Sequence, residues 1–64
     1  MAATELMLVT GERYEVDGEP EDVEKAILAA ARGSLMQLAW LEEADGGRAL
    51  GVNPAHVVSL RAAG

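Results

Sequence analysis

Short runs of apolar residues divided by glycine characterise the first seventeen residues of the chain. Residues 6–9 are apolar and have strand character, and residues 13–17 alternate between polar and apolar side chains as a half-buried strand does. Gly11 lies between them, where a tight turn needs a positive φ. The pattern predicts a β-hairpin over residues 1–17.

The next segment has apolar residues at helical spacing. Pro20 is tolerated in the first turn of a helix, the acidic residues after it suit the positive end of the helix dipole, and Gly33 is a natural stop. The apolar stripe consists of Val23, Ala26, Ile27, Ala30 and Ala31. The sequence therefore predicts one amphipathic helix over residues 20–32.

Residues 34–42 predict a third strand that is apolar on both faces. A strand of this kind is typical of a central position, buried on both sides. The helix can cover one face, and the other must be covered by curvature of the sheet or by another molecule. The two faces would carry Met36, Leu38 and Trp40 on one side, and Leu35, Ala39 and Leu41 on the other.

Two further strands follow, over residues 48–52 and 57–61. The Asp-Gly-Gly sequence at residues 45–47 predicts the hairpin turn that leads into the first, and Asn53-Pro54 predicts the corner before the second. The element order is β-β-α-β-β-β. We expect a single α+β domain over residues 1–64, with a mainly antiparallel sheet and one helix packed on one face.

Composition limits the chemistry of the chain. Half of its 64 residues are hydrophobic and none is cysteine, which excludes disulfides, thiolate metal sites and thiol catalysis. The absence of cysteine, of a signal peptide and of an apolar run of roughly 20 residues predicts a cytoplasmic protein outside the membrane. A core this small gives marginal stability, so we expect burial against a second copy or a permanent protein partner.

The net charge of −6 is concentrated in the first part of the chain. Eight acidic residues face Arg13 alone in residues 1–24, a balance of −7, whereas residues 25–64 have a balance of +1. Repulsion by the first region makes nucleic acid and anionic membranes poor partners. The acidic region is either a solvated face or a surface for a basic partner.

Candidate catalytic residues are few. His56 is the only histidine, and neither an orienting carboxylate nor a nucleophile accompanies it, so we expect no enzyme. A single histidine with scattered carboxylates does not make a zinc site, and no cofactor is expected. Trp40 is either core, in a chain poor in aromatic residues, or the anchor of an interface. The expected interaction surface comprises Met36, Leu38, Trp40 and His56.

The placed elements resemble those of a family of short, uncharacterised actinobacterial proteins. The similarity rests on the acidic helix start over residues 20–27, the glycine stop over residues 33–35, the turn and strand over residues 47–50 and the last strand over residues 57–60. Where that family carries a charged loop before its last strand, this chain has residues 53–56. The resemblance implies a fold and no activity.

The order of elements is also similar to that of ubiquitin-like β-grasp proteins, with a hairpin and a helix before strands that end at residues 60–64. Conjugating members of that family need a flexible Gly-Gly end, and Ala63 stands in place of the first glycine. Three hypotheses follow. The first is a non-enzymatic protein–protein interaction or assembly module, the second a β-grasp carrier or adaptor, and the third a small ligand-binding protein built around His56.

Overall fold

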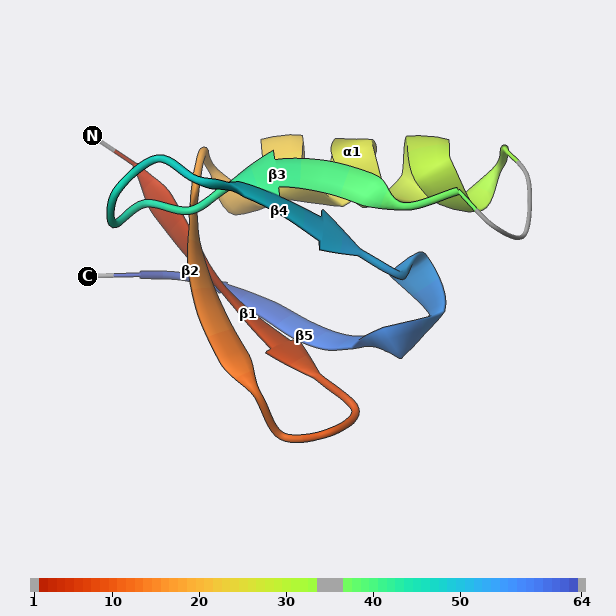
Figure 1. The fold of residues 1–64 in the computed structure, drawn as a ribbon, viewed down its shortest axis with the longest axis horizontal. Helices are drawn as coiled ribbons and strands as arrows, with labels where there is room; N and C mark the ends of the chain where they lie inside the picture. Colours follow the sequence, from red (N-terminus) through yellow and green to blue (C-terminus); the bar gives the residue numbers. More distant parts are fainter. Residues whose placement is uncertain (1, 34–36, 64) are drawn as a thin grey trace.

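The computed structural model describes residues 2–33 and 37–63. Its helix and five strands follow the order that the sequence predicts and lie in antiparallel sheets, which confirms the α+β fold (Figure 1). The elements in chain order are β1 (Ala3–Leu8), β2 (Arg13–Asp17), α1 (Pro20–Ala31), β3 (Ala39–Glu42), β4 (Ala49–Val52), the short 3-10 helix η1 (Pro54–His56) and β5 (Val57–Ala62).

β1 is the middle strand of a three-stranded antiparallel sheet, with β2 on one side and β5 on the other. Alternate residues of a strand point to opposite faces. Thr4 and Leu6 therefore point inward and are fully buried, while Glu5 and Met7 lie on the outer face. The ladder between β1 and β5 contains a bulge next to Leu8.

β3 and β4 form a second antiparallel ladder, which a short contact joins to the first sheet. Val16 at the end of β2 makes a bridge to Glu43, and the backbone N–H of Ala44 donates to the carbonyl oxygen of Glu15 at 2.9 Å. The two ladders thereby make one strongly curved wall, and α1 lies behind β3 (Figure 1).

The helix begins at Pro20, as predicted, and ends at Ala31, one residue before the predicted end. Arg32 forms the C-terminal cap, and its N–H donates to the carbonyl oxygen of Leu28 at 3.0 Å. Val23, Ile27 and Ala30 are the buried members of the apolar stripe. This spacing places one face of the helix on the concave side of the wall.

The core draws on every strand pair and on the helix. Its buried residues come from β1, β2, α1, β3 and β4, and partly buried side chains of β5 complete it. The buried hydrophobic residues are Leu6, Val16, Val23, Ile27, Ala30, Ala39 and Val52.

The predicted turns are present. Gly46 and Gly47 both have positive φ, 89° and 65°, in the turn between β3 and β4. At the corner before β5, the side-chain oxygen of Asn53 accepts a hydrogen bond from the N–H of Ala55 at 2.9 Å, and Pro54 starts η1. The Asn-Pro sequence therefore turns the chain by local bonding, as expected.

The prediction of a strand buried on both sides over residues 34–42 is wrong for the described part. The strand begins at Ala39, and its side chains alternate between Ala39, which is buried, and Trp40, which is 67% exposed. The inner face packs on α1 and the core, but no described element covers the outer face. Residues 34–36 of the prediction, Met36 among them, lie outside the described residues.

Replacement of Leu6 by alanine should destabilise the fold most clearly, because Leu6 is fully buried in the central strand. A buried Leu→Ala change costs about 2–5 kcal/mol, against a total stability of about 3–10 kcal/mol for a chain of this size. Urea unfolding followed by far-UV circular dichroism measures the loss. Val58→Ala is the control, since Val58 is 58% exposed and its truncation should cost under about 1 kcal/mol. Equal losses in both variants would contradict the assignment of the core.

Candidate interaction surface

The tryptophan surface, formed by Leu38, Trp40 and Gly51, lies on the outer face of the β3–β4 ladder. The register places Trp40 directly opposite Gly51. A β-carbon added at Gly51 would lie 3.0 Å from two atoms of the indole ring and 3.0 Å from Cδ1 of Leu38. The ring and the leucine therefore pack on the bare backbone of Gly51, in the space that another residue's side chain would occupy.

The strand period explains why this surface is exposed. Ala39 and Leu41 point toward the core, so Trp40 between them must point outward. Trp40 remains 67% exposed and Leu38 38% exposed although both pack on Gly51. A large aromatic side chain on an open sheet face is an unusual feature, because most tryptophans are highly buried.

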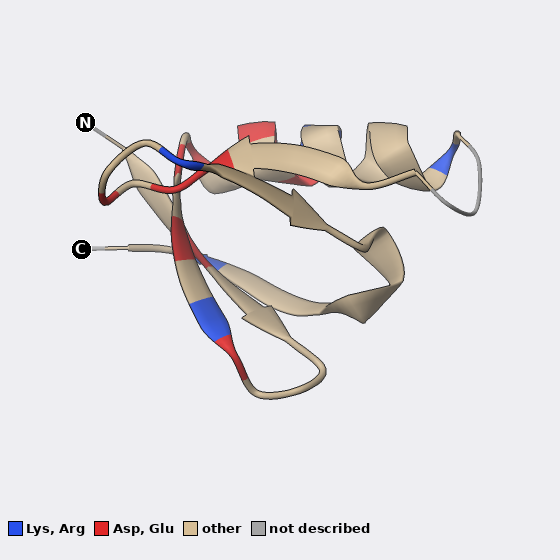
Figure 2. Cartoon of the chain, viewed as in Figure 1, with Lys and Arg blue, Asp and Glu red and all other residues tan. Residues whose placement is uncertain are grey.

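β4 and η1 contain no aspartate, glutamate, lysine or arginine. Charged residues lie on β1, β2, α1, β5, the end of β3 and the turn between β3 and β4, and Figure 2 colours none along β4 or η1. The nearest ion pair joins Nε of Arg48 to Oε2 of Glu43 at 3.4 Å, next to the start of β4. The tryptophan surface thus adjoins an uncharged strand on one side and acidic residues on the other.

His56, the fourth residue of the expected surface, is held by its backbone in η1. Its carbonyl oxygen accepts from the N–H of Val9 at 2.8 Å, and its own N–H donates to the carbonyl oxygen of Asn53 at 2.9 Å. Its side chain is exposed and makes no hydrogen bond or ion pair among residues 2–33 and 37–63. The structure therefore brings Trp40 and Leu38 together, and no described contact joins His56 to them.

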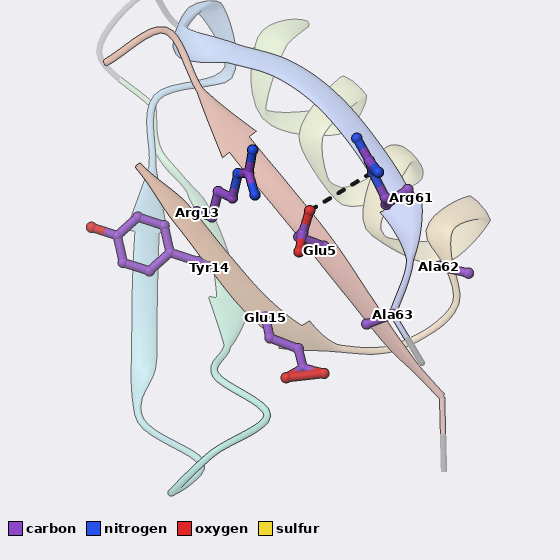
Figure 3. Close-up of a pocket in the computed structure, with 7 residues that line it drawn as sticks. All are labelled: Glu5, Arg13, Tyr14, Glu15, Arg61, Ala62 and Ala63. Atoms are coloured by element: carbon purple, nitrogen blue, oxygen red, sulfur yellow. Dashed lines mark ion pairs between the residues drawn. The ribbon is translucent and has the colours of Figure 1, made fainter. Parts of the chain in front are cut away.

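A polar hollow lies on the outer face of the three-stranded sheet (Figure 3). It has a volume of about 530 Å³, and its wall includes Glu5, Arg13, Glu15 and Arg61. Oε1 of Glu5 lies 3.7 Å from Nε of Arg61, and Figure 3 shows the carboxylate of Glu5 between the two arginine side chains. Exposed pairs of this type contribute little to stability, and the hydroxyl of the lining residue Tyr14 bonds to Glu12, which does not line the hollow.

A second, apolar groove of about 260 Å³ runs between α1 and η1. Ile27 and Leu28 line it from the helix, and Pro54 and Ala55 line it from η1. Leu28 is exposed at its rim. Neither this groove nor the polar hollow includes the side chain of His56 among its lining residues.

The described part of the chain contains neither a cluster of metal-ligating side chains nor a helix that could span a membrane. Residues 2–33 and 37–63 contain no group of three or more histidine, aspartate or glutamate side chains placed to hold a metal ion. Within the same residues, neither α1 nor η1 has the length and apolar character needed to cross a membrane.

Comparisons with protein-family models, with curated proteins and with solved structures find no match to this chain. The assignment of a site therefore rests on the geometry alone.

The pKa of Tyr14 in β2 is raised by its neighbours. Its hydroxyl donates to Oε2 of Glu12 at 3.0 Å, and Oε1 of the same carboxylate accepts from Oγ1 of Thr10 at 2.9 Å. The hydrogen bond to Glu12 and then the negative charge of Glu12 raise the pKa of Tyr14 above its ordinary value of 10.0. Both effects favour the neutral phenol over the phenolate.

Glu12→Ala should lower the pKa of Tyr14 toward its ordinary value, because it removes both main causes of the shift. Tyr14 is the only tyrosine, so the absorbance of tyrosinate during an alkaline titration reports it alone. The folded chain retains a proton that the unfolded chain releases, so this contribution to stability is present below pH 10.0 and lost as the pH rises through the folded pKa. Glu21→Ala, in the helix, is the control and should leave the midpoint unchanged. An unchanged midpoint in Glu12→Ala would contradict the assignment.

Proposed function

We propose that the protein is a non-enzymatic protein–protein interaction module that binds through the tryptophan surface. The observation that supports this most is the exposure of Trp40, the only tryptophan, on a sheet face that no described element covers. A cytoplasmic location, expected from the lack of cysteine, belongs to the same proposal.

The energy available at this surface is large for so small a chain. An aromatic side chain buries about 150–250 Å², of which two-thirds remains exposed here, and about 25 cal/mol per Å² gives about 2.5–4 kcal/mol on full burial. Tryptophan is also among the residues that dominate binding hot spots. One anchor of this size can be the largest single contribution to an interface, and the rest of the contact area supplies the remaining binding energy.

The rigidity of the anchor adds to the argument. The indole ring and Leu38 pack on Gly51, so the ring has a supporting surface before any partner arrives. A side chain already held in place loses less conformational entropy on binding than a free one. This arrangement is typical of a preformed contact surface.

The other hypotheses find less support. A carrier needs a free C-terminal end, whereas the N–H of Ala63 donates to the carbonyl oxygen of Ala3 at 2.9 Å and continues the sheet. A ligand site around His56 lacks a hollow lined by that side chain among the described residues. The hydroxyl–carboxylate contacts of Glu12 with Thr10 and Tyr14 are exposed, and Glu12 lines neither hollow, so they give catalysis little support.

Trp40→Ala should weaken binding of a protein partner at least about tenfold, as removal of a hot-spot residue does. The immobilised chain would be exposed to an extract, captured proteins identified by mass spectrometry, and the affinity of each purified candidate measured for the wild type and the variant. Trp40 is the only tryptophan, so its fluorescence emission should also shift to shorter wavelength as the partner covers it.

Val58→Ala provides the matched control, because Val58 is an exposed apolar residue of a different strand. It should bind as the wild type does. If all three proteins bind a partner equally, or if the emission of Trp40 stays unchanged with every partner and at every protein concentration, the proposed function is wrong.

A further inference from the structure

β4 has one free edge. It pairs with β3 alone, and Figure 1 shows it diverging from β5 beyond η1. The N–H of Glu43 donates to the carbonyl oxygen of Arg48 at 2.8 Å, which fixes the phase of the ladder. Hydrogen-bonded residues alternate along an antiparallel strand. Leu50 and Val52 therefore direct their backbone groups toward β3, and Ala49 and Gly51 direct theirs outward.

The outward groups of β4 have no partner within residues 2–33 and 37–63. No backbone hydrogen bond there uses the N–H or the carbonyl oxygen of Ala49 or of Gly51. Both residues are also the smallest of the strand, so their side chains do not obstruct an approaching backbone. An edge of this kind is a template for pairing with another strand.

The other edges differ from β4. Beside β2, Ala44 donates to the carbonyl oxygen of Glu15, and β5 has a bulge in its ladder and carries the charged Arg61. Proteins protect exposed edges with charges, prolines, bulges or a covering segment. The four residues of β4 include no charge and no proline, and their ladder is regular. β4 thus has a free edge without a charge, a proline or a bulge.

We propose that a second copy of this chain pairs with that edge, so that two β4 strands run antiparallel about a twofold axis at Leu50. This proposal rests on the proposed function and names the partner. In this register Ala49 lies opposite Gly51 of the second copy, and Gly51 opposite Ala49 of the second copy. The outward N–H and carbonyl groups of both residues then pair, and a twofold axis makes the same strand serve both sides.

The tryptophan surface fits the same arrangement. The ring of Trp40 packs on Gly51, so the next side chain along the outer face would be Ala49 of the second copy. Alanine leaves the ring unobstructed and adds an apolar contact at its edge. Pairing of the edges therefore extends the apolar surface without any movement of Trp40.

Charge favours this edge for self-association of an acidic chain. Each copy has a net charge of −6, so two copies approach best through a region without carboxylates. β4 has none, and the first charged residue before it is the cation Arg48. Most of the acidic residues lie on the β1–β2 hairpin, on the turn between β3 and β4 and on the first half of α1 (Figure 2), and Glu42 of β3, opposite Ala49, is the carboxylate next to this edge.

Ala49→Pro tests the pairing, because proline removes one outward N–H and leaves the bonds between β4 and β3 in place. Ala62→Pro is the matched control: Ala63 donates to Ala3, so the N–H of Ala62 points to the free edge of β5. Sedimentation equilibrium from micromolar to millimolar concentration should show a dimer for the wild type and for Ala62→Pro. Ala49→Pro should weaken the dimer at least about tenfold.

Two measurements do not depend on the folding of that variant. In the wild type, amide hydrogen exchange at Ala49 and Gly51 should slow as the protein concentration rises, whereas Leu50 should be protected throughout by its bond to β3. The chain has no cysteine, so Leu50→Cys can form only an intermolecular disulfide. Directly opposed residues of a non-hydrogen-bonded pair lie about 4.5 Å apart, within the reach of that bond. Leu60→Cys, on β5, should remain monomeric under the same mild oxidation.

The outcomes separate this inference from the proposed function. Concentration-dependent protection of Ala49 and Gly51, with the disulfide in Leu50→Cys, supports the pairing. A dimer that persists unchanged in Ala49→Pro overturns the pairing through β4 but leaves binding through Trp40 intact. A monomer at millimolar concentration whose Ala49 and Gly51 amides become protected only when a different protein is added overturns the second copy as the occupant.

Discussion

The antiparallel pairing of β1 with β5 joins the two ends of the chain, and the other elements depend on it. β1 also pairs with β2, so its inward residues Thr4 and Leu6 lie at the centre of the three-stranded sheet. The hydroxyl of Thr4 donates to the carbonyl oxygen of Gly18 at 2.9 Å, which ties this sheet to the start of α1. Pairing β1 with β5 closes the chain between them into a long loop, and the entropy cost of closing a loop grows only slowly with its length. Burial of apolar side chains along β1 offsets this cost.

A chain of 64 residues can cover only one face of each sheet. α1 fills the concave side, where Val23 and Ile27 meet the buried residues of β1 and β3. None of the described elements covers the convex side at Trp40. Every second side chain of each strand therefore lies on an uncovered outer face. These side chains include charged residues on the three-stranded sheet and Trp40 on the two-stranded ladder. The exposed tryptophan follows from the size of the fold.

Local signals in the sequence were sufficient to predict the helix, the strands and the turns, but they were insufficient to predict the interaction surface. Pro20, Gly33 and Asn53 act through φ and nearby hydrogen bonds, so the helix and the corner before β5 could be predicted within a residue or two. Periodicity also separated Trp40 from Ala39, but it cannot tell which face of a strand is covered, because that depends on distant elements. The free edge of β4 depends on strand order, which no local pattern contains.

Gly51 shows a different consequence of the same packing. Its φ is not among the positive values found at other glycines, so its backbone would accept any residue. A side chain there would require the ring of Trp40 and Cδ1 of Leu38, which lie above it, to shift. We therefore expect positions 40 and 51 to change together: tryptophan favours glycine opposite it, and loss of the ring opens space for a β-branched residue in the strand. The two positions, eleven apart in sequence, thus act as one packing unit.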